Sequence, residues 1–132
     1  MSYSGQCLCG AIRYQLSGEP TVVAICHCND CRRHSDAPMV AWAMFAETSL
    51  TVTKEHPKTI NLSGAAMRSF CADCGSGLFY RNSEILPNIV DVQSSTLDNL
   101  NALPPTVQIQ TAERLIWMKH VHKLPEFDRY PV

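Results

Sequence analysis

The residues of this chain that can do chemistry are seven cysteines, and they occur in three tight clusters. The clusters are Cys7 and Cys9, then Cys26, Cys28 and Cys31, then Cys71 and Cys74. Their spacings are CxC, CxCxxC and CxxC, and no cysteine lies outside them. Thiolates two or three residues apart can bind one tetrahedral zinc ion, with each sulfur about 2.3 Å from the metal. The clustering therefore predicts metal sites.

The number of cysteines predicts how the clusters are used. A closed structural zinc site takes four protein ligands, whereas a catalytic zinc has three protein ligands and one open position. Seven sulfurs therefore suggest one site of each kind. Each outer pair supplies half of a four-thiolate site, and the central cluster can hold a metal by itself. We expect a structural zinc on Cys7, Cys9, Cys71 and Cys74, and a second, open and catalytic zinc on Cys26, Cys28 and Cys31.

Other interpretations of the cysteines stay open at this point. The outer pairs can be small buried hydrophobic side chains. The central cluster can be empty, partly occupied or purely structural, because a sequence does not show an open coordination position. Water, a substrate thiolate or a nearby side chain can take that position, and His27 and His34 are the nearest candidates. His27 is alternatively a residue packed behind the site, because the cysteines on either side of it face the metal.

Two arginines, Arg32 and Arg33, directly follow the central cluster. Their charge can offset that of a zinc bound by three thiolates, or can bind a ligand that carries a carboxylate. We predict both as substrate-binding residues, with two solvated charges beside a loop as the alternative. The two tryptophans, Trp42 and Trp117, are predicted to belong to the core, unless one of them forms a wall of a substrate pocket.

Length and charge narrow the class of protein. A chain of 132 residues fits one domain, expected to span residues 1–132, and its 45% of apolar residues suffices for a globular core. The formal net charge is -1, and ionising seven thiols and adding two zinc ions brings it to -4. Such a protein lacks the basic surface that non-specific nucleic-acid binding needs, so we expect no nucleic-acid partner.

The N-terminus and the apolar runs bear on the compartment. Residues 1–10 have neither the basic start nor the apolar stretch of a signal peptide. The longest largely apolar run, residues 37–46, is shorter than the roughly 20 residues of a membrane helix. We therefore expect a cytoplasmic protein with no membrane partner. In a reducing compartment clustered cysteines indicate metal ligands rather than disulfides.

The segments that must position these cysteines are predicted to be mainly strands. Short apolar or alternating runs bounded by turn residues indicate them. We expect strands over residues 11–16, 21–25, 39–45, 50–53, 59–62, 67–70, 78–81 and 88–93. We expect one helical turn or a knuckle over residues 29–35, a second short helix over 95–101, extended structure over 107–118 and an irregular tail over 124–132. The predicted fold class is mainly β with one or two short helical turns.

Three stretches of the chain resemble a known family. They are residues 5–14 (GQCLCGAIRY), 26–33 (CHCNDCRR) and 70–78 (FCADCGSGL). In order, spacing and flanking residues they resemble the glutathione-dependent formaldehyde-activating (GFA) and centromere-protein-V family. Weaker similarity extends through residues 97–98, Trp117 and the tail over residues 124–131. The resemblance covers essentially the whole chain.

The resemblance implies a fold and an activity. The fold is a β-tent of small antiparallel sheets joined by zinc, with the outer cysteine pairs at the structural site and the central cysteines at the catalytic metal. The activity is that of a zinc-dependent carbon–sulfur lyase, acting on a small thiol such as glutathione and a small aldehyde, or on their adduct. Arg32 and Arg33 would steer an anionic substrate. The chain departs from the family pattern at residues 34–36, where many members have a Ser-Gly turn, and at Gln108, where histidine is common.

Two hypotheses about partners stand beside the enzyme. A non-enzymatic zinc module that binds a small thiol or a protein would carry the same cysteines, and an open metal position with a pocket distinguishes the enzyme from the module. Assembly into a homodimer also stays open.

Overall fold

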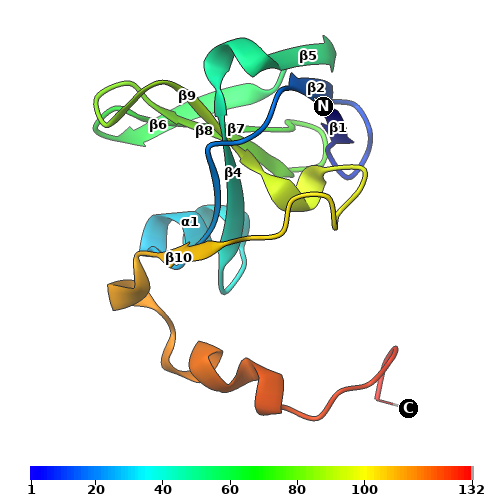
Figure 1. Cartoon of the computed structure of the whole chain (residues 1–132), viewed down its shortest axis with the longest axis vertical. Coiled ribbons are helices and arrows are strands. Elements are labelled where there is room, and N and C mark those ends of the chain that lie inside the picture. Colours follow the sequence, from blue (N-terminus) through cyan, green and yellow to red (C-terminus); the bar gives the residue numbers. More distant parts are fainter. Residues whose placement is uncertain (132) are drawn as a thin grey trace.

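The computed structural model describes residues 1–131, and its regular structure is mostly β-strands (Figure 1). The strands are β1 (Ser2–Gln6), β2 (Arg13–Ser17), β3 (Val22–Cys26), β4 (Val40–Ala46), β5 (Leu50–Lys54), β6 (Lys58–Ser63), β7 (Ala66–Phe70), β8 (Gly77–Asn82), β9 (Leu86–Gln93) and β10 (Val107–Ile109). The α-helix is α1 (Asn29–Ser35), and 3-10 helices span Glu47–Ser49, Ser94–Thr96, Thr111–Glu113 and Ile116–Lys123. The prediction of a mainly β fold with short helical turns is confirmed.

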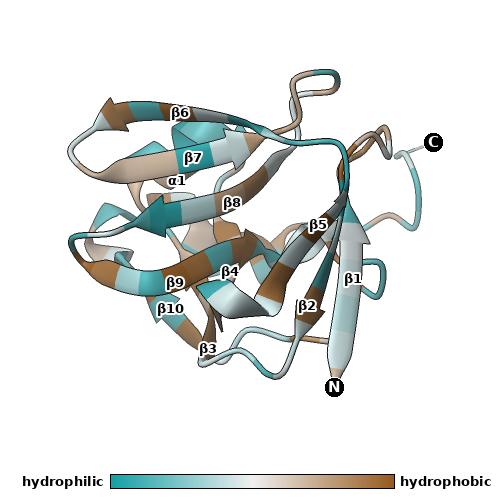
Figure 2. Cartoon of the chain, turned by 90° about the horizontal axis from the view of Figure 1, so that it is seen from above, coloured by the Kyte–Doolittle hydropathy of each residue, from teal (hydrophilic) through white to brown (hydrophobic). Residues whose placement is uncertain are grey.

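The strands form two sheets. A three-stranded sheet has the order β1-β2-β5, and a seven-stranded sheet has the order β10-β3-β4-β9-β8-β7-β6. Neighbouring strands are antiparallel except for β10 and β3, which are parallel. In Figure 2 the three-stranded sheet stands on one side of the molecule and strands β6 to β9 on the other. Strands far apart in the sequence therefore lie side by side.

The main core lies between the two sheets. Tyr14 and Leu16 alternate with more exposed residues along β2 and are at most 1% exposed. They pack with buried side chains of the larger sheet, such as Phe79, whose ring lies edge-on to Tyr14 with 5.2 Å between the ring centroids. Burying a large apolar side chain stabilises the fold by about 1.5–3 kcal/mol. The Tyr14 hydroxyl group keeps a hydrogen-bond partner in Thr96 Oγ1 at 2.6 Å.

The seven-stranded sheet has a second face with a different character. On β9, Val90 and Val92 belong to the main core, so the side chain of Asp91 between them points to the opposite face. Asp91 lies opposite Tyr80 of β8, and Tyr80 lies opposite Arg68 of β7. Trp42 of β4 packs against Tyr80 with 6.0 Å between the ring centroids. We call the surface formed by Trp42, Arg68, Tyr80 and Asp91 the outer face.

Several expected elements agree with the structure, two differ, and one strand was not expected. The helical turn expected over residues 29–35 matches α1 residue for residue. The sequence of β1 (SYSGQ) has no apolar alternation and did not predict a strand, but pairing with β2 forms one. The helix expected over 95–101 is a single 3-10 turn, because Leu97 pairs with Gly5 in an isolated β-bridge and continues in extended conformation. The extended structure expected over 107–118 ends at Ile109, because Gln110 has a left-handed backbone with a φ of 55°.

Beyond β10 the chain leaves the sheets as an arm, drawn in orange and red in Figure 1. Trp117 on this arm is 52% exposed, so the prediction that it belongs to the core is wrong. The physical reason is the turn at Gln110, after which the arm contacts α1 rather than the core: the backbone N–H of Asn29, at the start of α1, donates to Glu113 Oε1 at 3.1 Å. Trp42 is buried as predicted. Within residues 1–131 no helix combines the length and the apolar character that crossing a bilayer demands.

Replacing Gly5 by alanine is expected to destabilise the fold. A methyl group at Gly5 overlaps the ring of Tyr14 and the carbonyl oxygen of Thr96, and neither can shift freely because Tyr14 is fully buried. We expect Gly5→Ala to lower the free energy of unfolding of the metal-loaded protein by about 1–3 kcal/mol in urea denaturation. The control Ser2→Ala, at an exposed position on the same strand, should change it by less than about 0.5 kcal/mol. Equal stabilities of the two variants would contradict this packing.

Candidate metal centres

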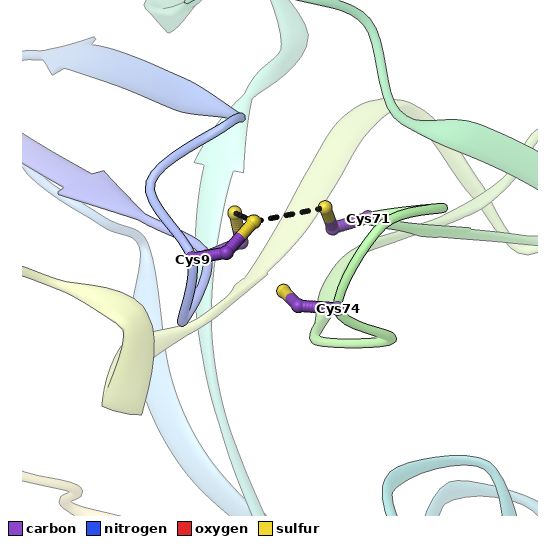
Figure 3. Close-up of side chains that lie close together, drawn as sticks. Cys9, Cys71 and Cys74 are labelled. Atoms are coloured by element: carbon purple, nitrogen blue, oxygen red, sulfur yellow. Dashed lines mark hydrogen bonds between the residues drawn. The ribbon is translucent and has the colours of Figure 1, made fainter.

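Four of the cysteines meet between two loops. Cys7 and Cys9 lie in the loop between β1 and β2, and Cys71 and Cys74 lie in the loop between β7 and β8. Their sulfur atoms all lie within 4.8 Å of one another, and Figure 3 shows the sulfurs of the two loops pointing toward a common centre. The Sγ atoms of Cys7 and Cys9 are 3.7 Å apart, and those of Cys9 and Cys71 are 3.8 Å apart. We call this group the outer cluster.

The spacing of these sulfurs fits a tetrahedral metal ion. Four sulfurs at about 2.3 Å from a zinc ion lie about 3.8 Å from one another. The Cys7–Cys9 and Cys9–Cys71 sulfur–sulfur distances agree with that edge length, and no disulfide joins any of the seven cysteines. The outer cluster therefore has the donor atoms and the geometry of a closed four-thiolate metal site.

Local backbone structure turns these sulfurs inward. Gly75 has a φ of 82°, and its N–H donates to the carbonyl oxygen of Cys71 at 2.8 Å, which closes the turn between the two cysteines of that loop. In the other loop, the backbone N–H of Ile12 donates to Cys7 Sγ at 3.3 Å. The hydroxyl group of Ser76, followed by backbone N–H groups, lowers the pKa of the Cys74 thiol to about 5. Hydrogen bonds of this kind favour the thiolate form that binds metal.

The other three cysteines form a second group at the start of α1, which we call the inner cluster. Cys26 ends β3, Cys28 is the N-cap of α1, and Cys31 lies in its first turn. The backbone N–H of Cys31 donates to Cys28 Sγ at 3.3 Å, so the sulfur itself caps the helix. The three sulfur atoms also lie within 4.8 Å of one another. They therefore can hold one metal ion from one short segment of the chain.

The inner cluster has three protein donors. Among residues 1–131 no histidine, aspartate, glutamate or further cysteine joins it within the same distance. His27 is 1% exposed, and its Nε2–H donates to Gln108 Oε1 at 2.8 Å, so the ring points toward β10. His34 packs edge-on against Phe70, with 6.0 Å between the ring centroids. Neither histidine completes the inner cluster.

An arginine that the sequence analysis did not identify contacts this cluster. Both terminal nitrogens of Arg68 lie 3.7 Å from Cys31 Sγ, and the guanidinium group lies 4.8 Å from the ring centroid of Tyr80. Hydrogen bonds from the Cys26 and Cys28 thiols, together with the charge of Arg68, lower the pKa of the Cys31 thiol to about 5. The same coupling, with burial, raises the pKa of Cys26. One thiolate is therefore favoured at Cys31 even before a metal binds.

Asp91 is a second residue of the outer face that the sequence analysis missed. It is 9% exposed, and burial, followed by the charge of Cys31, raises the pKa of its carboxyl group to about 6. The available signal was a single carboxylate inside the apolar run Ile89–Val92 of β9. A carboxylate in such a run indicates a buried polar site. The sequence alone does not show that the site adjoins Cys31.

The two arginines that were predicted as substrate-binding residues have different surroundings. The guanidinium group of Arg32 donates to the carbonyl oxygens of His27 and Glu113 and to Asn29 Oδ1. Arg33 is exposed. Both line an open cavity of about 390 Å³ between α1 and the arm. Arg32 thus fastens α1 to the start of the arm, and a role of either arginine in substrate binding stays a prediction.

Comparisons with known proteins agree with this geometry. A family model described as glutathione-dependent formaldehyde-activating enzyme matches residues 2–113. A Schizosaccharomyces pombe protein named as an uncharacterized lyase is 32% identical over 78 residues, which are 59% of this chain and 56% of the relative. The match thus spans about half the length of that curated relative.

A solved structure shares the fold. The crystal structure of a Rhodobacter sphaeroides protein superposes with a TM-score of 0.64 at 22% sequence identity, and the match covers 80% of this chain and 98% of the other. Because the family model matches residues 2–113, which is most of the chain and includes all seven cysteines, the protein belongs to the glutathione-dependent formaldehyde-activating (GFA) family.

Proposed function

We propose that this protein is a zinc-dependent carbon–sulfur lyase that acts on a thiol such as glutathione and a small aldehyde, or on their adduct. The observation that carries the proposal is the inner cluster, in which three cysteine sulfurs converge without a fourth protein donor among residues 1–131. Three protein ligands and one open position are typical of catalytic zinc. Membership of the GFA family and the lyase name of the S. pombe relative support the same reaction class.

The two clusters are proposed to have different roles. The outer cluster joins the β1–β2 loop to the β7–β8 loop, and Cys7 and Cys71 are each 1% exposed, which suits a zinc ion that holds the fold. The inner cluster lies beside the polar outer face, which suits a zinc ion that meets substrate. All seven cysteines are free thiols, and this chemistry requires them reduced, in keeping with a cytoplasmic location. A homodimer stays a prediction.

The chain's own residues can move the proton that the reaction requires. Zinc at the inner cluster would supply a Lewis acid that lowers the pKa of a bound thiol. The Asp91 carboxylate lies opposite Tyr80 in the strand register. The guanidinium group of Arg68 lies over the Tyr80 ring and contacts Cys31 Sγ. We propose that the Asp91 carboxylate accepts the proton of the substrate thiol and returns it to the aldehyde oxygen as the carbon–sulfur bond forms. In reverse, the carboxylate takes the hydroxyl proton of the adduct, the carbon–sulfur bond breaks, and the thiol regains the proton.

The open cavity at α1 offers a way for substrate to approach. Arg33 is exposed at this cavity and carries a charge that attracts the carboxylates of a thiol such as glutathione. Arg32 lines the same cavity and adds to the positive potential while its donors are engaged by the backbone. We propose that the two arginines steer the anionic thiol toward α1.

The division of roles predicts different outcomes for two cysteine variants. Cys71→Ser should lose the outer metal and unfold, because a structural zinc site contributes about 10–16 kcal/mol, as much as the whole stability of a small domain. Cys28→Ser should remain folded, bind one zinc ion and lose activity. The measurements are zinc content per chain, far-ultraviolet circular dichroism and urea denaturation. If the two variants lose structure to the same extent, the division of roles is wrong.

Glutathione should bind to the zinc-loaded protein through its thiol. The thiol ionises on binding, so calorimetry in two buffers of different ionisation enthalpy should show release of about one proton when Asp91 is replaced by asparagine, and less in the wild type, where Asp91 accepts the proton. S-methylglutathione, which has the same carboxylates and no free thiol, is the matched control and should bind more weakly and release no proton. Formaldehyde adds to thiols unaided, so the rate of adduct formation is compared with that background. If glutathione does not bind and the protein does not change that rate, the proposed function is wrong.

Asp91→Asn should slow the reaction without removing zinc. General acid–base catalysis typically contributes about 10²–10⁴-fold, and an amide cannot accept the proton. Because the pKa of Asp91 is raised to about 6, the carboxyl group is protonated below that pH, so wild-type adduct formation should fall in acid through about pH 6. The variant should lose that step in its pH profile. Asp98→Asn, which alters an exposed ion pair with Arg13, is the control. An unchanged pH profile in Asp91→Asn would assign the step to another group.

A further inference from the structure

The sulfur atoms of the inner cluster receive N–H donors from different sources. Cys28 Sγ accepts from the backbone N–H of Cys31 at 3.3 Å, a bond that exists because α1 begins there. Cys31 Sγ instead faces the side chain of Arg68, with both terminal nitrogens at 3.7 Å. Arg68 comes from β7, 37 residues further along the chain. Both of these N–H donors to Cys31 Sγ therefore belong to one side chain, which a single substitution can remove.

Arg68 is held in place without a carboxylate partner. Its guanidinium group lies over the ring of Tyr80 at 4.8 Å, and Tyr80 in turn packs against buried Trp42. In the part of the chain that the structure describes, the salt bridges are Arg13 with Asp98 and Arg81 with Glu47, so Arg68 is in neither. Aromatic packing orients the fork of Arg68. Its positive charge is available to Cys31.

The contact between Arg68 and Cys31 can balance the charge of the metal-loaded inner cluster. Three thiolates around a divalent ion leave one net negative charge at a site where two of the three cysteines are buried, and the buried carboxyl group of Asp91 lies on the outer face beside it. Placing an uncompensated charge there is costly. A fully charged guanidinium group beside Cys31 offsets it. The same contact bears on reactivity, since a ligand thiolate is itself a nucleophile and an aldehyde is an electrophile.

We propose that Arg68 is a positioning residue of the inner cluster: its two N–H donors draw negative charge from Cys31 Sγ, which holds Cys31 as a metal ligand and keeps it from reacting with the electrophilic substrate. The incoming thiol is then the nucleophile that reacts. The inference rests on the proposed function, because it requires a metal at the inner cluster. It also explains how a tris-thiolate site stays electrophilic, since hydrogen bonds to a ligand sulfur reduce the charge that the sulfur donates.

The test compares full-length, zinc-loaded variants that differ at one arginine. Arg68→Met removes the charge and both donors but keeps an apolar chain over Tyr80. Arg68→Lys keeps the charge and loses the fork. The matched control is Arg81→Met, because Arg81 also lies over an aromatic ring, that of Phe79, but its guanidinium group pairs with Glu47 rather than with a cysteine.

Two measurements that do not depend on activity are made on each variant. Competition with a chelator should show that Arg68→Met weakens zinc binding at the inner cluster by about 10- to 100-fold, the usual effect of losing a partner of a metal ligand. Iodoacetamide labelling at saturating zinc, resolved by mass spectrometry, should show faster alkylation of Cys31 in Arg68→Met with little change at Cys28. Arg68→Lys should be intermediate, and Arg81→Met should match the wild type.

The outcomes separate this inference from the proposed function. If the wild type binds zinc at the inner cluster and Arg68→Met matches Arg81→Met in affinity and in Cys31 labelling, the inference alone is wrong. If Arg68→Met labels Cys26, Cys28 and Cys31 faster to the same extent, Arg68 merely holds the structure and the inference is also wrong. If the wild type binds no metal at the inner cluster, both the inference and the proposed function are wrong. Should Arg68→Met fail to fold, the comparison of Arg68→Lys with the wild type decides.

Discussion

The arrangement of the two sheets brings four sulfur atoms from two loops, distant in the sequence, to within 4.8 Å of one another. Cys9 and Cys71 are 62 residues apart in the sequence, yet their sulfurs lie 3.8 Å apart. The β1–β2 loop belongs to the small sheet and the β7–β8 loop to the large one, so a metal bound by the outer cluster would join one sheet to the other at the edge of their shared core. The packing of Tyr14 against Phe79 continues the same contact between the sheets.

The alternation of side chains along β9 places residues that stabilise the core on one face of the sheet and a residue near the inner cluster on the other. Val90 and Val92 complete the core between the sheets, while Asp91, one peptide bond from each, belongs to the opposite face. A mutation of the valines therefore acts on stability, and a mutation of the aspartate acts on the surroundings of the inner cluster. The two faces share a backbone and differ in what they contact. This lets the outer face tolerate a buried carboxylate that a core position would not accept.

The sequence predicted the features that depend on nearby residues. The grouping of the cysteines, the bounds of α1 and most strands follow from spacing and alternation within a few residues. Arg68 and Asp91 were missed because their approach to Cys31 depends on the strand order β4-β9-β8-β7, which no short stretch encodes. Tertiary context also decided β1, which forms only by pairing with β2, and the end of β10, where the backbone at Gln110 turns the chain away. The apolar and alternating segments predicted the mainly β class, and the resemblance to the GFA family added its arrangement in small sheets, of which the structure has two.

The two clusters also differ in how far apart their cysteines lie in the sequence. The three sulfurs of the inner cluster all come from residues 26 to 31, whereas those of the outer cluster come from both ends of a 68-residue stretch. Local contacts form early in folding and distant contacts form late, because closing a long loop costs more entropy. During synthesis, all three cysteines of the inner cluster are in the chain before Cys71 has been added. The inner cluster, proposed for catalysis, therefore has all its ligands available for metal before the outer cluster, proposed for stability.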